Sequence, residues 1–419
     1  MHLFEYFVRI IRLSSDMPIC KTYRFRIYPT PKQESRLRAW QDALRALWNL
    51  AQEQRLIGLP NKKYLTAFDQ QADLKELRAE FPWVADVPRN VCSQLLVELD
   101  RAWQRCFKKL AFKPRWKRKG RDVLSICEPH PKVWSLTAEG IKFPKLGAIR
   151  TVLHRQVHGT PKTCTLKLDV DQWCACITVE QEAEKPAPRT TPVVAIDRGI
   201  VNLTADSDGK IVPAARYFNR TRQRLARAQR TVSRCKKGSK NREKAKLKVA
   251  RLHRTIRNQR DHVLQTLSHA YSQSHGTVVV EDLRIKNMVR AGKGLARGIL
   301  DSGWGKFALL LKYKMLWNGG RLVTVPAAYS SQTCSVCGHI AAENRKDQDF
   351  ACIACGVLDN ADLNAAKVLL QRYLADESTA TGCEGFVIRR PLKQQLRVVR
   401  RGQRTQGTDA SKAPAFRPG

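Results

Sequence analysis

Acidic residues are scarce in this sequence, and long apolar runs are missing. Of the 419 residues, 37 are Asp or Glu against 76 Lys or Arg, so the formal net charge is +39. No run of about 18 apolar residues occurs, which excludes a membrane-spanning helix. The apolar opening of residues 1–11 is interrupted by Glu5 and Arg9 and is followed by no small-residue cleavage site, so we predict no secretory signal.

The excess of positive charge indicates the kind of partner. Like charges on a compact chain repel one another unless a polyanion neutralises them, and nucleic acid is the obvious polyanion. Hydrophobic residues make up 43% of the chain, which is enough for a sizeable core, and the length predicts two or three domains. Thirteen cysteines, an odd number in a chain without a secretory signal, argue against a disulfide framework and favour a reducing cytoplasm.

The first half of the chain changes from a strand pattern to helices and back. Residues 21–28 alternate strictly, which predicts a half-buried strand with a basic open face. Pro31 stands at the first helical position of a capping-box sequence, and apolar residues at helical spacing follow it and recur over 90–112. Short strand patterns then run from 123 to 180. We therefore expect a β-barrel-like domain into which the helices of 31–112 are inserted.

The second half alternates strands and helices, which is typical of an α/β domain. Two buried strands, 193–197 and 277–281, each end in a carboxylate residue. Between them, residues 216–260 hold eighteen Lys or Arg and a single acid, which predicts one or two basic helices with a hairpin turn near 237–240. A charge run is usually a solvated face, but so many cations on helices repel strongly unless phosphate lies against them.

Four cysteines form two C-x-x-C pairs, which is the spacing of a metal site. Each pair brings two thiolates to one ion, and the glycine after each pair permits a tight turn. Four thiolates close a tetrahedral structural zinc site and leave no open position for catalysis. A redox dithiol is the alternative, and the occurrence of two pairs together argues against it. The predicted zinc ligands are Cys334, Cys337, Cys352 and Cys355.

Three acidic residues are candidates for a second metal site. Asp197 and Glu281 each end an apolar β-rich run, at the edge where a doubly wound sheet places its active site. Asp362 begins a predicted helix, from which a carboxylate can also face inward. Three acids that meet at one sheet edge can hold two Mg²⁺ ions, which activate a water and stabilise the departing oxygen in phosphodiester hydrolysis. An Asp at a strand end is also a common helix cap, and the sequence leaves that alternative open.

Several motifs in this chain occur in a family-specific order. The sequence contains Ala195-Ile-Asp-Arg-Gly199, Val280-Glu-Asp-Leu283, Ser330-Ser-Gln-Thr-Cys-Ser-Val-Cys-Gly-His339, Cys352-Ile-Ala-Cys-Gly356 and Asp362-Leu-Asn-Ala-Ala366. This order resembles the TnpB family, the RNA-guided nucleases of bacterial insertion sequences, which are related to miniature type V CRISPR effectors. Residues 21–33 also resemble the start of that family, and the resemblance covers roughly 20–375.

The resemblance implies the domain organisation. Residues 1–16 and the tail after about 376 match nothing in the family, and the basic, weakly periodic tail is predicted to be flexible. The implied parts are a wedge β-barrel over 17–30 and 113–185, a helical recognition lobe over 31–112, a RuvC, ribonuclease-H-like nuclease domain over 191–329 and 359–375, a zinc ribbon over 330–358, and the tail 376–419.

Residue by residue, the resemblance also implies a site. Asp197, Glu281 and Asp362 match the family's catalytic triad, which binds two Mg²⁺, and the four cysteines match the ligands of one structural Zn²⁺. Arg345, between the cysteine pairs, matches an arginine near the scissile phosphate. The implied function is an RNA-guided, metal-dependent DNA endonuclease of a prokaryotic cytoplasm, acting at the nucleoid, whose partners are a guide RNA and target double-stranded DNA.

Two other functions are alternatives. A DNA-joining transposase would use similar carboxylates, but the four-cysteine insertion before the last acid argues against it. A non-catalytic RNA-guided DNA-binding regulator would have lost triad residues, whereas all three acids are present here. The sequence shows neither a helix-turn-helix signature nor zinc-finger histidines for reading a long DNA site.

Overall fold

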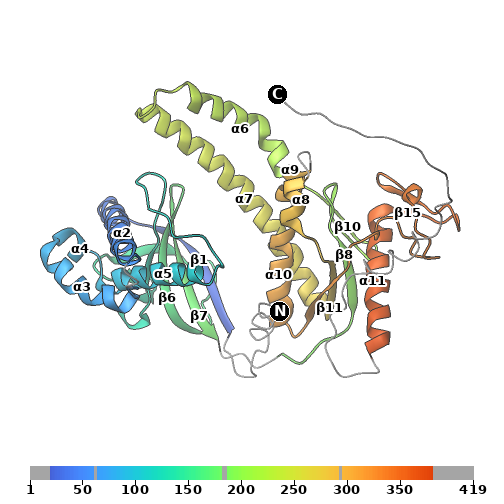
Figure 1. Cartoon of the computed structure of the whole chain (residues 1–419), viewed down its shortest axis with the longest axis horizontal. Coiled ribbons are helices and arrows are strands. Elements are labelled where there is room, and N and C mark those ends of the chain that lie inside the picture. The colour runs from blue at the N-terminus through green and yellow to red at the C-terminus, as the bar shows by residue number, and fades with distance from the viewer. Residues whose placement is uncertain (1–18, 61–63, 182–185, 292–294, 381–419) are drawn as a thin grey trace, which may run out of the picture. The chain divides into compact units, whose positions relative to one another are not determined.

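The computed structural model describes residues 19–60, 64–181, 186–291 and 295–380 (Figure 1). The predictions for residues 1–16 and for most of the tail concern residues outside these ranges. Contacts divide the chain into two compact units, each with its own sheet. The units are Met1–Pro186 with Thr221–Arg257, and Ala187–Arg220 with Asn258–Gly419.

The first unit is built on a seven-stranded antiparallel sheet. In spatial order its strands are β2 (Ile126–Glu128), β6 (Thr160–Asp169), β7 (Gln172–Gln181), β1 (Ile19–Tyr28), β5 (Gly147–Val152), β4 (Gly140–Phe143) and β3 (Ser135–Thr137). The strand predicted over 21–28 is confirmed as β1, which pairs with β7 and β5. Among the described residues no pairing joins the edge strands β2 and β3, so these strands form an open sheet where we expected a barrel.

Helices occupy the chain between β1 and β2. They are α2 (Pro31–Gly58), α3 (Ala67–Glu80), α4 (Pro82–Asp86) and α5 (Arg89–Phe107). The capping box is confirmed: Gln33 N donates to Thr30 Oγ1 at 3.3 Å, and Thr30 N donates to Gln33 Oε1 at 3.0 Å. The apolar faces of α2 and α5 share one buried core with Phe25 of β1. The helix predicted over 90–112 ends earlier, because Lys109 turns the chain with a φ of 56°.

The open face of β1 is basic as predicted, but its cations are not all free. Arg24 Nη2 donates to Asp169 Oδ2 at 2.7 Å. Arg257 of α7 (Lys240–Ser274) donates to the same carboxylate at 2.6 Å, and Arg254 donates to Asp171 in the β6–β7 turn at 2.5 Å. The two acids at this turn therefore hold arginines from a strand and from a helix.

The basic segment 216–260 forms the predicted helical hairpin. α6 (Tyr217–Arg234) and α7 run side by side (Figure 1), and the turn between them contains Gly238 with a φ of 83°. Arg242 Nη1 donates to the carbonyl oxygens of Val232 and Cys235 at 2.7 and 2.9 Å. One cation of the segment thus satisfies the carbonyl groups at the end of α6.

The second unit contains the α/β domain. Its sheet has the order β10 (Ile211–Pro213), β9 (Asn202–Asp206), β8 (Val193–Asp197), β11 (Thr277–Glu281) and β12 (Arg321–Val325). β11 runs parallel to both β8 and β12, whereas β9 is antiparallel to β8. Successive residues of a strand face opposite sides, so Val194 packs with α10 (Trp304–Trp317) while Ala195 packs with α11 (Ala361–Ala380). Burial of both faces explains the unbroken apolar strands.

The remaining elements complete the second unit. α8 (Ile285–Ala291) and α9 (Ala296–Ser302) precede α10, and a small sheet of β13 (Arg345–Lys346), β14 (Asp349–Ala351) and β15 (Leu358–Asn360) precedes α11. α11 continues to Ala380, so the start of the segment assigned to the flexible tail is helical. None of the described helices is long and apolar enough to cross a membrane.

Candidate active site and metal centre

Two of the selected acids stand at the ends of neighbouring strands. Asp197 is the last residue of β8, and Glu281 is the last residue of β11. The two strands are parallel and adjacent, with Ile196 paired to Val280. Because parallel strands end at the same edge of a sheet, the register brings both acids to that edge.

Asp362 reaches the same site from the first turn of α11. α11 packs against β8 and β9. The helix is capped by another residue, since Asn360 Oδ1 accepts hydrogen bonds from the N–H groups of Asp362 and Leu363 at 3.0 and 3.3 Å. Asp362 is nonetheless only 4% exposed. Asn360 rather than Asp362 therefore caps this helix, which leaves the buried carboxylate free for other contacts.

Two side chains fix the orientation of the Asp362 carboxylate. Arg345 Nη2, from β13, donates to Oδ1 at 2.8 Å, and Asn202 Nδ2, from β9, donates to Oδ2 at 2.9 Å. The Asn202 amide also donates to Gln348 Oε1 at 2.7 Å. The carboxylate is thus held at once from the five-stranded sheet and from the small sheet of β13–β15, so its position depends on both.

The acids influence one another electrostatically. Burial raises the pKa of Asp197 well above its usual range, and the charges of Glu281 and Asp362 raise it further, against the opposing effect of Arg345 and Arg198. Burial also raises the pKa of Glu281. A cation among these acids would offset the cost of keeping them ionised together. Their carboxylate oxygens therefore suit a hard divalent cation.

The three carboxylate groups lie farther apart than the ligands of a single metal ion. Within the described ranges, a single group of three or more His, Cys, Asp or Glu side chains has all its ligand atoms within 4.8 Å of one another, and it is the four-cysteine cluster. The acids are close enough to change the pKa of Asp197. In this arrangement they cannot all bind the same ion.

The four predicted metal ligands do meet in space. The Sγ atoms of Cys334 and Cys355 are 3.7 Å apart, and those of Cys337 and Cys352 are 3.6 Å apart. Thiolates placed tetrahedrally around a common metal ion would be about 3.8 Å apart, from the usual metal–sulfur distance. The cysteine cluster therefore has the size of a tetrahedral metal site.

Both cysteine knuckles have the same backbone geometry. Gly338 N donates to Cys334 O at 3.0 Å, and Gly356 N donates to Cys352 O at 2.9 Å. The glycines adopt φ values of 75° and 74°, which side chains with a Cβ rarely adopt. Backbone N–H groups, that of Cys355 first, lower the pKa of the Cys352 thiol to about 6, which favours the thiolate that binds metals.

The structure adds neighbours that the sequence analysis did not select. Arg198 is buried and donates to the backbone oxygen of Glu281. A hydrogen bond from Ser330 acts on the Glu281 carboxylate. Asn202 donates to the Asp362 carboxylate, and Gln348 accepts a hydrogen bond from Asn202. Arg198 follows Asp197 directly and Ser330 opens the first cysteine motif, so both stood inside quoted motifs, whereas no signal pointed to Asn202 or Gln348.

Family comparisons divide the chain into three matched segments. A family described as "Probable transposase" matches residues 176–292, and one described as "Cas12f1-like, TNB domain" matches 304–369. A third, described as "Helix-turn-helix domain", matches 17–56, where our sequence analysis found no such signature. The described residues of that segment form β1 and most of α2, a strand and a single helix.

Known proteins match almost the whole chain. A protein of Escherichia coli K12 described as "Putative RNA-guided DNA endonuclease InsQ" is 35% identical over 90% of this chain and 97% of its own length. A Streptomyces pristinaespiralis protein described as "Putative RNA-guided DNA endonuclease" is 31% identical over 91% of this chain and 94% of its own length.

A solved structure supports the same relationship at the level of fold. The chain in the "Cryo-EM structure of the Cas12f1-sgRNA-target DNA complex" aligns with a TM-score of 0.50 at 14% identity, over 84% of this chain and 98% of that one. Together with the relative that is 35% identical over 90% of this chain, the matches show that the chain belongs to the TnpB family.

Proposed function

We propose that this chain is an RNA-guided, metal-dependent DNA endonuclease that hydrolyses phosphodiester bonds. One observation carries the proposal: two parallel strands and a helix bring three acids close enough for their charges to interact. The acids are Asp197, Glu281 and Asp362. Relatives described as RNA-guided DNA endonucleases support the substrate class, because they match the chain over nearly its full length.

The three acids would hold two Mg²⁺ ions in a RuvC-like site. Bound there, the ions would activate a water and stabilise the departing oxygen of the cut strand. The residues around them keep the acids in place: Arg345 and Asn202 each hold one oxygen of Asp362, and Arg198 fixes the backbone at the end of β11. Arg345 is proposed to contact the scissile phosphate as well.

The cysteine cluster would hold one structural Zn²⁺. Four thiolates leave no position for water or substrate, so this ion would contribute to folding rather than to chemistry. Its position has a consequence for the acids, because Arg345 lies between the two cysteine pairs and donates to Asp362. The zinc ribbon over 330–358 is therefore proposed to hold one side of the active site.

The two units would divide the work between binding and cutting. In this proposal the sheet of the first unit is the wedge and the helices of 31–112 are the recognition lobe, while 191–329 and 359–375 form the nuclease domain. The partners are a guide RNA and target double-stranded DNA at the nucleoid. The eighteen cations of 216–260 are suited to the RNA backbone, because phosphates would relieve their mutual repulsion.

The test separates cutting from binding. The protein is expressed with its native flanking DNA, the RNA that copurifies is sequenced, and a plasmid with the matching target is supplied. Asp197→Ala should reduce cutting by at least 100-fold while RNA-dependent DNA binding stays nearly unchanged. Asp208→Ala, at an exposed acid in the β9–β10 turn, is the matched control and should cut normally. Undiminished cutting by Asp197→Ala, or cutting in EDTA, would contradict the proposal.

A DNA-joining transposase is the second candidate, favoured by one observation. The family that matches 176–292 is described as a probable transposase. The two functions differ in their products, since a transposase joins 3′ ends to a target whereas a nuclease releases them. Ribonuclease treatment distinguishes them as well. Site-specific cutting or strand joining by RNA-free protein would favour the transposase.

A further inference from the structure

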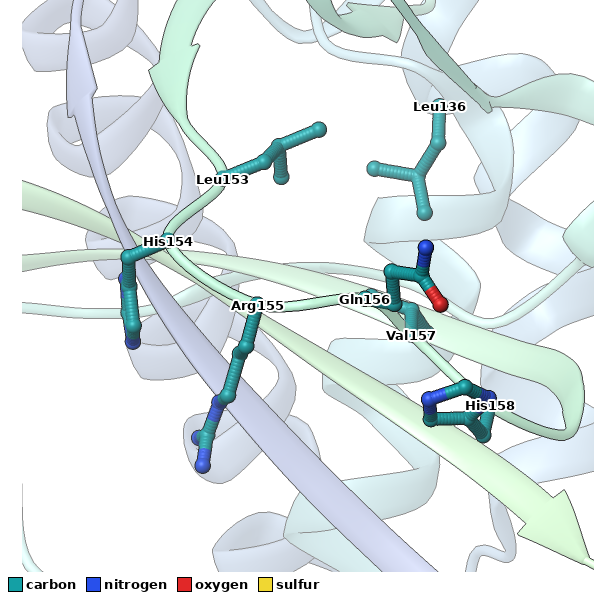
Figure 2. Close-up of a pocket in the computed structure, with 7 residues that line it drawn as sticks. All are labelled: Leu136, Leu153, His154, Arg155, Gln156, Val157 and His158. Atoms are coloured by element: carbon teal, nitrogen blue, oxygen red, sulfur yellow. The ribbon is translucent and has the colours of Figure 1, made fainter.

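A hollow on the first unit lies outside the site described above. The segment 153–159, which joins β5 to β6, has no regular secondary structure. Together with Leu136 of β3 it lines an open hollow of about 470 Å³. Figure 2 shows the side chains of Leu136, Leu153 and Gln156 directed toward this common space, whereas His154 and Arg155 leave the loop on its other side.

The loop is held in place before any ligand arrives. The His154 ring lies 5.3 Å from the Phe25 ring, and the Arg155 guanidinium lies over Tyr23 at 5.0 Å. Gln181 Nε2 donates to the carbonyl oxygen of His158 at 2.8 Å. Gly159, with a φ of 108°, lies so close to the sheet that a Cβ there would be 2.7 Å from the Glu180 carbonyl oxygen. A fixed loop loses little entropy on binding, so the hollow is preorganised.

The chemistry of the lining is apolar with a polar rim. Leu136 and Val157 pack on the core of the unit, while Leu153 remains 39% exposed, so a firm apolar surface is open to solvent. The Gln156 amide, an exposed group, has no hydrogen-bond partner among the described residues and offers both a donor and an acceptor. Arg155 and two histidines line the space, and no carboxylate does.

A nucleotide is the ligand that fits these features together. Its base has apolar faces and a hydrogen-bonding edge, and its phosphate suits a rim without acids. The volume lies in the range of small-molecule sites and is far too small for a duplex. Unpaired bases are also the part of RNA that proteins read by stacking and edge contacts. On the edge that carries N7, adenine presents an adjacent donor and acceptor, which a glutamine amide matches, whereas guanine presents two acceptors there.

We propose that this hollow binds one unpaired adenine nucleotide of the RNA that the protein carries. The base packs against Leu136 and Leu153, and the Gln156 amide binds its edge. The site rests on the proposed function only in requiring that RNA is the partner. It adds to that function a base-specific contact, because backbone contacts elsewhere on the chain are indifferent to sequence.

The test compares two RNAs that carry the same charge. Ribonuclease-treated full-length protein is titrated with single-stranded oligoadenylate and oligouridylate of equal length at one salt concentration. The wild type should prefer oligoadenylate, and Gln156→Leu should lose roughly ten-fold of that preference while its affinity for oligouridylate is unchanged. Gln104→Leu, at an exposed glutamine of α5, should keep the preference. Ultraviolet crosslinking of the copurified RNA should attach it within 151–159.

The outcomes separate the pocket from the wider proposal. An oligoadenylate preference that is equal in the wild type and in Gln156→Leu, or crosslinks that map only to other segments, would overturn the pocket while RNA binding itself stands. Failure to bind RNA of any sequence would overturn both the pocket and the proposed function. If segment 151–159 instead crosslinks to a copurified peptide, the hollow binds that peptide and the nucleotide proposal is wrong.

Discussion

At the scale of single residues, neighbouring polar groups at the start of α11 have separate tasks. Asn360 caps the helix, which leaves both oxygens of Asp362 to Arg345 and Asn202. A helix that begins with its cap two residues before an acid can therefore present that acid sideways into a site. Loss of the cap is expected to destabilise the helix, by roughly 1 kcal/mol. Loss of Arg345 or Asn202, which hold the Asp362 carboxylate, is expected instead to slow cutting.

Arg345→Ala should lower cutting by about 10- to 100-fold, the usual effect of removing a group that orients a metal ligand. Binding of RNA-loaded protein to its target DNA should stay close to the wild-type value, because the rest of the basic surface is intact. Cutting and binding are measured on the same plasmid. Lys346→Ala, an exposed cation on the same short strand, is the control and should cut normally. Equal losses in both variants would show that Arg345 acts only through charge.

Burial of a second residue, Glu128 in the first unit, makes the stability of the folded protein depend on pH. It is fully buried, one of its carboxylate oxygens has no partner among the described residues, and burial raises the pKa of the carboxyl group above its usual range. The ionised form is therefore disfavoured in the folded protein. The resulting loss of stability is absent at acidic pH below the unfolded pKa and is complete above the folded pKa.

Glu128→Gln should for this reason raise the free energy of unfolding at pH 7, by roughly 1 kcal/mol. The gain should shrink as the pH falls toward the ordinary pKa of a glutamate, because the wild-type carboxyl group is then protonated in both states. Thermal unfolding of the two proteins, followed at several pH values, measures the difference. A gain that stays constant with pH would mean that packing, not charge, explains it.

At the scale of elements, the cysteine-bearing segment supports the active site. Its strand β13 carries Arg345, and α11 begins directly after β15. Two backbone turns, the small sheet of β13–β15, the hydrogen bonds of buried Asn344 and a small apolar cluster hold this segment together around the four sulfur atoms. A metal ion bound by the four thiolates would add to its folding free energy.

Cys352→Ser should release about one zinc per chain and should impair cutting as well, because Arg345 and Asp362 lose their common support. Metal analysis of the purified variant and a cutting assay provide the two readouts. Cys20→Ser, at an exposed cysteine of β1, is the matched control and should keep both metal and activity. A wild-type protein without zinc, or a Cys352→Ser variant that cuts normally, would contradict this role.

Local patterns predicted the elements of both units better than they predicted the pairing of strands in the first unit. The strands ending at Asp197 and Glu281 were visible because burial of both faces leaves an unbroken apolar run before each acid. The capping box of α2 was visible for a similar reason, since it lies within four residues. The open seven-stranded sheet could not be predicted, because its pairs join residues as far apart as Thr22 and Thr178.

The same division applies to the candidate site. Sequence identified the acids and the cysteines, whose chemistry is rare enough to stand out at strand ends and in C-x-x-C pairs. It missed Asn202 and Gln348, because a polar residue in a strand or loop has no pattern of its own. Their hydrogen bond joins positions 146 residues apart, so it exists only in the folded chain. The roles of all these residues in cutting stay predictions.

At the scale of the whole molecule, the few acidic residues determine which basic side chains remain available to bind phosphates. The acids at the β6–β7 turn bind Arg251, Arg254 and Arg257, so these cations of α7 are already paired within the protein. Lys244 and Lys248 lie on an exposed part of the same helix and have no carboxylate partner among the described residues. The available charge of the hairpin is thus smaller than its count of eighteen basic residues suggests, and it lies on the lysines of α7 and on exposed arginines of α6 such as Arg222 and Arg224.

Replacement of Lys244, Lys246 and Lys248 by Gln should therefore reduce the salt dependence of RNA binding. Each phosphate contact contributes about 0.7 to the log–log slope for single-stranded and about 0.9 for duplex nucleic acid, so the triple variant should lower the slope by roughly 2 to 3. Arg251→Gln should change it far less, because that guanidinium already binds the Asp171 carboxylate. The slopes are measured by titrating ribonuclease-treated protein with the copurified RNA at several salt concentrations. If the triple variant kept the wild-type slope, phosphates would not contact this face of α7. A large effect of Arg251→Gln would mean that RNA displaces the carboxylate of Asp171 when it binds.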